Sequence, residues 1–119
     1  MTAQTFRWSE LPVDQPMDRI DRRRIIGEKM MISHVTLHEG FRVPTHSHAN
    51  EQFALVMSGR VRFNVGDAAR GDLRTVELTA GEVLHLPPHV PHDAEALETS
   101  VVLDLFSPPS EETGVDAAS

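Results

Sequence analysis

Short apolar segments separated by turn-forming residues run through most of this chain. Between residues 24 and 106, stretches rich in Val, Ile, Leu, Met and Phe alternate with Gly, Pro, Asn and Asp, a pattern typical of short β-strands. No helical period is sustained along these stretches. The pattern predicts an all-β domain with strands at residues 25–27, 30–38, 42–43, 52–57, 60–65, 73–78, 83–86 and 101–106.

The length of the chain limits the number of domains. A chain of 119 residues buries most of its apolar surface in one core and is too short for two. We expect a single antiparallel barrel or sandwich at residues 23–109. Residues 1–22 are polar with scattered apolar side chains and are expected to form an arm packed on the barrel. Residues 110–119 are rich in acids and small side chains and are expected to form a disordered tail.

Composition excludes several kinds of partner. Eleven basic and eighteen acidic residues give a net charge of −7, which disfavours binding to nucleic acids. The run Arg22 to Arg24 is interleaved with acids and is expected to be a solvated turn or strand start. No apolar span approaches the roughly 20 residues of a transmembrane helix, and no signal sequence is recognisable at the amino terminus. We therefore expect a soluble cytoplasmic protein that does not bind membranes.

Two segments carry residues at spacings suited to one metal ion. In GFRVPTHSHANEQFALVMSG (residues 40–59), His46 and His48 are two residues apart and point to the same side of an extended chain, with Gln52 nearby. In GEVLHLPPHVPH (residues 81–92), His92 supplies a further imidazole. The chain has no cysteine, so any metal must be held by nitrogen and oxygen atoms. The predicted cofactor is one divalent transition metal per chain, Fe, Mn, Ni or Zn, held by His46, His48, Gln52 and His92.

Glu51 is the alternative to Gln52 as a ligand. Residues of a strand alternate between faces, so these two side chains should point in opposite directions. Six residues separate Gln52 from Gly59, and this spacing favours Gln52 over Glu51 as the ligand. On the Gln52 face lie Ala54 and Val56, small residues that would leave room for a substrate.

Asp104 is the candidate proton carrier. It is two residues from both Val102 and Phe106 and shares their face of the last predicted strand. If that face is internal, its carboxylate lies near the metal in a poorly solvated place that raises its pKa. The alternative is a surface aspartate at the end of an edge strand. The remaining histidines are expected in the core or on the surface: His34, His38, His85 and His89.

These residues resemble the motifs of the cupin superfamily. The first motif, G(X)5HXH(X)3E(X)6G, is matched at Gly40, His46, His48, Gln52 and Gly59, with glutamine in place of glutamate. The second motif, G(X)5PXG(X)2H(X)3N, is matched at Gly81, Pro87 and His92, whereas His89 and Ala96 replace its glycine and asparagine. The resemblance implies a double-stranded β-helix, or jelly-roll barrel, around one metal site.

Within the superfamily the chain is similar to small pectin-degradation cupins, through GEKMM, HSHANEQ and LDLFSPP. This resemblance implies conversion of a 4,5-unsaturated monouronate to its linear ketonized form. It also implies that Asp104 is the acid/base group and Phe106 a wall of the substrate site. Ser110 stands where these proteins commonly have an arginine that could bind a substrate carboxylate.

Three functions follow from these residues. The first is a metal-assisted isomerase or lyase that acts on a small anionic carbohydrate or keto acid. The second is an iron-dependent dioxygenase, because histidine-rich sites can bind both substrate and oxygen. The third is a binding module that holds a small molecule without changing it. For each we expect a homodimer, with the apolar side chains of the arm as the contact surface.

Overall fold

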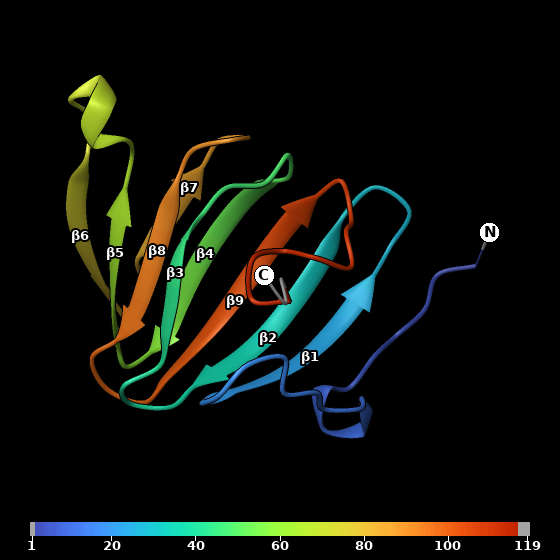
Figure 1. The fold of residues 1–119 in the computed structure, drawn as a ribbon. Coiled ribbons are helices and arrows are strands. Elements are labelled where there is room, and N and C mark those ends of the chain that lie inside the picture. The colour runs from blue at the N-terminus through green and yellow to red at the C-terminus, as the bar shows by residue number, and fades with distance from the viewer. Residues whose placement is uncertain (1, 117–119) are drawn as a thin grey trace.

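Two antiparallel β-sheets face each other in the computed structural model, which describes residues 2–116 (Figure 1). The five-stranded sheet has the order β1 (Ile20–Ile26), β2 (Met31–Leu37), β9 (Ser100–Ser107), β4 (Glu51–Ser58) and β7 (Val83–Leu86). The four-stranded sheet has the order β3 (Arg42–His46), β8 (His92–Ala96), β5 (Arg60–Val65) and β6 (Arg74–Thr79). Two short 3-10 helices, η1 (Trp8–Glu10) and η2 (Ala68–Arg70), complete the elements. This is the jelly-roll barrel that the sequence predicted.

No helix within residues 2–116 is long and apolar enough to span a bilayer.

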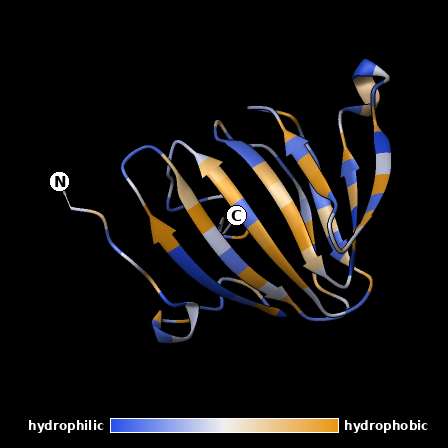
Figure 2. Ribbon diagram, turned by 180° about the vertical axis from the view of Figure 1, so that it is seen from behind, coloured by the Kyte–Doolittle hydropathy of each residue, from blue (hydrophilic) through white to orange (hydrophobic). Residues whose placement is uncertain are grey.

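Alternation along the strands decides which side chains enter the barrel. In β2 every second residue is buried, from Met31 to Leu37, and the hydropathy colours of Figure 2 alternate along the strands in the same way. In the pairing of β2 with β9, Ser33 lies opposite Asp104 and Val35 opposite Val102. Asp104 therefore faces the inside of the barrel, as the spacing from Val102 predicted.

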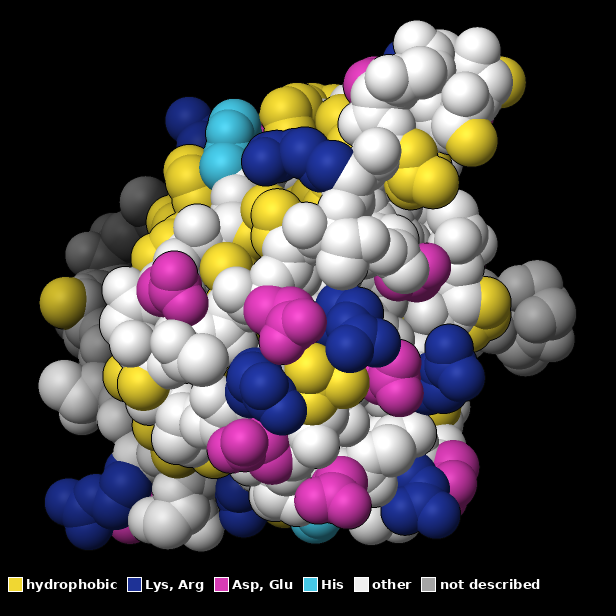
Figure 3. All heavy atoms as spheres, turned by 90° about the vertical axis from the view of Figure 1, so that its left-hand side faces the viewer, with side chains coloured by type: hydrophobic (Ala, Val, Ile, Leu, Met, Phe, Trp, Pro, Cys, Tyr) yellow, Lys and Arg dark blue, Asp and Glu magenta, His cyan; other side chains and the backbone are white. Residues whose placement is uncertain are grey.

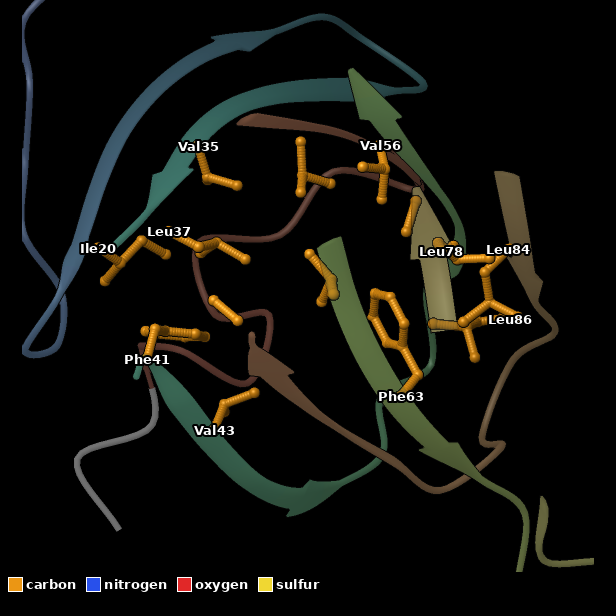
Figure 4. Packing of buried hydrophobic residues seen from close by; sticks show 14 of the residues in the cluster. Ile20, Val35, Leu37, Phe41, Val43, Val56, Phe63, Leu78, Leu84 and Leu86 are labelled. Carbon is orange, nitrogen blue, oxygen red and sulfur yellow. The ribbon is translucent and has the colours of Figure 1, made fainter. Parts of the chain in front are cut away.

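The core lies between the two sheets and is almost wholly aliphatic and aromatic (Figure 4). Its most completely buried side chains include Phe41, Val56, Val61 and Leu86. Burying a side chain of this size stabilises the fold by about 1.5–3 kcal/mol. The core thus holds the two sheets together and fixes the backbone from which the polar residues of the site project.

The outer face of the four-stranded sheet carries interleaved basic and acidic side chains (Figure 3). Arg62 lies 3.6 Å from Glu95 and 3.8 Å from Glu77, and Arg60 lies 3.7 Å from Glu77. Ion pairs between such exposed groups contribute at most about 1 kcal/mol each. The stability of this sheet therefore comes from its inner, apolar face.

The amino-terminal arm packs on its own barrel and ends earlier than expected. Strand β1 begins at Ile20, so the arm comprises residues 2–19 of the described chain rather than extending to residue 22. The Trp8 ring lies 5.1 Å from the ring of His34, and Met17 packs against the core. Other apolar side chains of the arm stay exposed, Phe6 at 52% and Val13 at 46%. The homodimer stays a prediction.

The C-terminal segment, residues 108–116, is ordered against the barrel. The prediction of a disordered tail from residue 110 is wrong for this part, and residues 117–119 lie outside the described residues. Thr113 is buried, Val115 packs against the core, and Asp116 pairs with Arg22. Composition indicated disorder because it carries no information on tertiary contacts. Here Asp116 pairs with the buried Arg22, and Thr113 and Val115 line the cavity of the barrel.

Candidate metal centre

Three histidines from different parts of the sequence meet at one end of the barrel. His46 ends β3, His48 lies in the loop that follows, and His92 begins β8 directly opposite His46 in the sheet register. The ring centroids of His46 and His92 are 4.3 Å apart, and those of His48 and His92 are 5.1 Å apart. One nitrogen from each ring lies within 4.8 Å of the other two. The three imidazoles could hold one metal ion.

Backbone carbonyls set the tautomer of all three rings. Each Nδ1 contacts a carbonyl oxygen two residues away: Pro44 for His46 (2.9 Å), Asn50 for His48 (3.0 Å) and Val90 for His92 (2.9 Å). A carbonyl only accepts hydrogen bonds, so each Nδ1 carries a proton and donates it. Each Nε2 is then left with a free lone pair, the form in which histidine binds metals.

Burial favours the neutral forms of His48 and His92. It lowers the pKa of His92 to about 4 and also lowers the pKa of His48, and the nearby His46 acts in the same direction on both. A metal ligand has to be unprotonated at the donor atom. The fold therefore favours, for His48 and His92, the neutral state that a cation needs.

Gln52 points inward from β4 and completes the donor set. Its Nε2 donates to the Asp104 carboxylate at 2.9 Å, which turns its Oε1 toward Nε2 of His48 at 3.1 Å. Both of these atoms are acceptors, so no proton joins them in this tautomer. A divalent cation held by both atoms would resolve the contact, because each atom would then give its lone pair to the ion. The donor set fits a divalent metal ion, and we propose Gln52 as the fourth ligand.

Asp104 lies beside this cluster. Burial raises the pKa of its carboxyl to about 6, and the hydrogen bond from Gln52 partly opposes the rise. Among residues 2–116, it is the one carboxylate that lines the cavity inside the barrel. The Phe106 ring lines the same cavity and meets the His48 ring edge to face, with centroids 5.8 Å apart. The structure thus brings Asp104 and Phe106 to the histidine cluster.

Ala54 and Val56 are not brought to the cavity. They lie on the inner face of β4, as expected, but their exposed fractions are 0% and 1% and both belong to the core. Neither is among the residues that line the cavity in the described chain. Beyond Gln52 the inner face of β4 passes into closely packed core, so these side chains have no free surface for a substrate.

Glu51 points away from the cluster, as the strand alternation required. Its carboxylate lies 2.7 Å from Nε2 of His85 on the outside of the barrel. The His85 ring in turn stacks on Phe53, with ring centroids 4.8 Å apart. His38 is similarly engaged by the Asp21 carboxylate at 2.8 Å. These histidines have surface partners and take no part in the cluster.

Arg22 is the residue of the cavity that sequence reasoning missed. It was expected to be solvated, yet its side chain is only 3% exposed and lines the cavity. Burial alone would lower its pKa, but the Asp116 and Asp14 carboxylates outweigh burial and raise it. The period of two along β1 could have located it, because Arg22 is two residues from the buried Ile20. Ser110, by contrast, is bonded within the C-terminal segment, to the Glu112 carbonyl.

Comparisons with known proteins agree with this arrangement. A family model described as a cupin domain matches residues 33–106, a span that contains all three histidines. The structure is similar to an RmlC-like cupin from Shewanella frigidimarina, with 23% identity over 92% of this chain and 95% of that chain and a TM-score of 0.79. It is similar to KdgF from Halomonas sp., with 27% identity over 92% and 97% and a TM-score of 0.80.

It also resembles oxalate decarboxylase from Lactobacillus farciminis, with 20% identity over 94% of this chain, 35% of that longer chain and a TM-score of 0.80. Among curated proteins no significant match was found. The family match covers more than half of the sequence, and the barrel and histidine cluster agree with it. The chain belongs to the cupin family.

Proposed function

We propose that this chain is a metal-dependent enzyme that moves a proton within a small anionic carbohydrate or keto acid. The reaction would be the ketonization or ring opening of a compound like an unsaturated uronate. The observation that carries the proposal is the place of Asp104. Its carboxylate lies inside the barrel and accepts a hydrogen bond from Gln52, beside three histidines that could hold one metal ion.

The charge of the donor set favours an anionic substrate. His46, His48 and His92 are neutral imidazoles and Gln52 is a neutral amide, so none of them compensates the charge of a divalent cation. Such a site attracts anionic oxygen atoms. A bound ion would supply Lewis-acid stabilisation of the negative charge that develops on an enol or carbonyl oxygen.

Asp104 would carry the proton. Ketonization takes one proton from an enol oxygen and adds one to the neighbouring carbon, so neither oxidant nor reductant is needed. Asp104 in its acid form can give a proton to the carbon, and its carboxylate can then accept the enol proton. Phe106 would exclude water on one side of the substrate, which keeps the proton between these groups. Gln52 holds the Asp104 carboxyl in place by its hydrogen bond.

Two resemblances support this reaction class. The motif segments resemble those of pectin-degradation cupins that act on unsaturated uronates. The similarity to KdgF extends over nearly the whole of both chains.

The variant Asp104→Asn tests the proton carrier. Its amide oxygen can still accept the hydrogen bond from Gln52, so the metal site should keep its geometry and its metal content. Turnover should fall by about 100-fold to 1,000-fold, the size of effect typical of a lost general acid or base. The assay follows the loss of the conjugated double bond of a 4,5-unsaturated uronate by ultraviolet absorbance, with deuterium incorporation at carbon measured by NMR in heavy water.

Other outcomes would replace the proposal. Consumption of oxygen by the iron-loaded protein in the presence of substrate would indicate the dioxygenase. A uronate that binds and is recovered without deuterium would indicate a binding module. Full turnover by Asp104→Asn would remove Asp104 from the mechanism.

A further inference from the structure

The C-terminal segment lies inside the mouth of the cavity. Figure 1 shows it looping back across the space between the sheets, in front of β9 and β2. Thr113 and Val115 line the cavity from this segment. The Gly114 backbone is pressed against Nε2 of His46, so closely that a Cβ at Gly114 would collide with the ring. The segment therefore covers the Nε2 side of His46.

The space that remains is too small for a sugar acid. The cavity volume is about 60 Å³. Pockets that hold organic ligands usually measure roughly 300–1,000 Å³. A monouronate could enter only if Thr113 and Val115 moved out, which requires the C-terminal segment to detach. The structure thus shows a closed form of the barrel.

Among the described residues that line the cavity, Arg22 is the one arginine or lysine. Its Nη1 and Nη2 lie 2.9 Å and 2.6 Å from the two oxygens of Asp116, a bidentate contact. On its other side, Nε and Nη2 hold both oxygens of Asp14 at 3.0 Å and 2.6 Å. The edge of the guanidinium that presents Nη1 and Nη2 to Asp116 has the geometry to bind any carboxylate with two hydrogen bonds. Asp14 orients Arg22 from the arm, and its own side chain is 48% exposed.

The two carboxylates of Arg22 differ in their relation to the cavity. Asp116 is 13% exposed and belongs to the same segment as the cavity-lining Thr113 and Val115. Asp14 approaches from outside and does not line the cavity within the described residues. If the segment detached, Arg22 would keep Asp14 and lose Asp116. Its inward N–H groups would then be available to a ligand.

We propose that Arg22 binds the carboxylate of the ligand and that Asp116 takes the position of this carboxylate in the closed form. The inference deepens the proposed function and rests on its anionic substrate. The ligand class is a sugar acid or keto acid, with its carboxylate at Arg22 and its reacting carbons between Asp104 and the histidines. The register supports this span, since Arg22 pairs with Val35 and Val35 with Val102, two residues before Asp104.

The segment and the ligand then compete for one site. A ligand that binds only the open form loses apparent affinity in proportion to the population of the closed form. Removing the Asp116 charge should therefore tighten ligand binding. Removing Arg22 should weaken the binding of acids and leave neutral sugars unaffected.

The experiment is calorimetric titration of metal-loaded protein with galacturonate, and with galactose as the matched sugar that lacks a carboxylate. For Asp116→Asn the dissociation constant for galacturonate should fall roughly 5-fold to 50-fold relative to the native chain. For Arg22→Met it should rise at least about 10-fold, the usual loss for a charged hydrogen-bonded partner. Asp14→Asn is the control, because it removes a carboxylate from Arg22 without opening the cavity, and it should not tighten binding.

Hydrogen exchange gives a second measurement that does not depend on Arg22→Met being folded. Galacturonate should speed amide exchange in residues 110–116 of the native chain, and Asp116→Asn should do so without ligand. Unchanged exchange in both cases, or equal affinity for galactose and galacturonate, would overturn the proposal. If Asp116→Asn binds galacturonate more tightly but no uronate is turned over, the Arg22 subsite is supported and the proposed enzyme activity is wrong. If uronate is turned over and Asp116→Asn has the same KM as the native chain, the enzyme activity is supported and the competition by Asp116 is wrong.

Discussion

The double variant His46→Ala, His48→Ala is expected to lose its metal completely. Losing a single outer partner of a ligand costs about 10–100-fold in metal affinity, so losing two ligands should cost at least about 10⁴-fold. The remaining His92 and Gln52 cannot surround an ion. Metal content by mass spectrometry should fall from about one ion per chain to none, and activity toward any substrate of the metal site should be lost with it.

The matched control removes two histidines outside the cluster. His34 contacts Trp8 and His85 contacts Glu51, both away from the cavity. The double variant His34→Ala, His85→Ala has the same number of imidazoles as the test variant and should keep its metal. Circular dichroism would confirm that both variants are folded. Retention of an ion by His46→Ala, His48→Ala would place the metal elsewhere.

The histidine cluster could be predicted from the sequence because the spacing of residues along an extended chain decides to which side their side chains point. His46 and His48 converge although only His46 lies in a strand, and their ring centroids are 5.8 Å apart. Gln52 and Glu51 separate to opposite faces of β4 for the same reason. Asp104 faces inward because β9 keeps its alternation from Val102 onward.

Strand β8 was not predicted because its sequence lacks the usual strand residues. HDAEA contains no β-branched or large apolar side chain. The strand exists because β3 and β5 flank it and pair with it on both sides. Tertiary pairing thus overrides local propensity, and His92 is positioned by neighbours distant in the sequence.

The partnership of Arg22 with Asp116 could not be predicted from local pattern. The two residues are 94 positions apart, and each belongs to a charged stretch that composition assigns to solvent. Burial of Arg22 is possible only because two carboxylates arrive from opposite ends of the chain. The coarse architecture follows from periodicity, whereas the closing of the cavity depends on this long-range pair.

Gly59→Ala is expected to destabilise the fold by about 4 kcal/mol or more, which combines backbone strain with overpacking. Gly59 makes the turn between β4 and β5 at φ +86°, a conformation that side chains disfavour. An added Cβ would also lie 2.6 Å from both the Thr99 carbonyl oxygen and the Ser100 Cα. These are backbone atoms at the start of β9, so they cannot move aside without shifting the strand that carries Asp104. Thermal unfolding by circular dichroism would measure the loss.

Gly71→Ala separates the two causes. Gly71 also has a positive φ, +74°, but a Cβ there would have no heavy atom within 4 Å. The substitution should therefore cost only the strain of a left-handed conformation, about 1 kcal/mol. If both variants lose the same stability, the contact of the β4–β5 turn with β9 is looser than the structure shows. A large loss at Gly59 alone would establish that this turn fixes the position of β9, and through it the position of Asp104 beside the histidines.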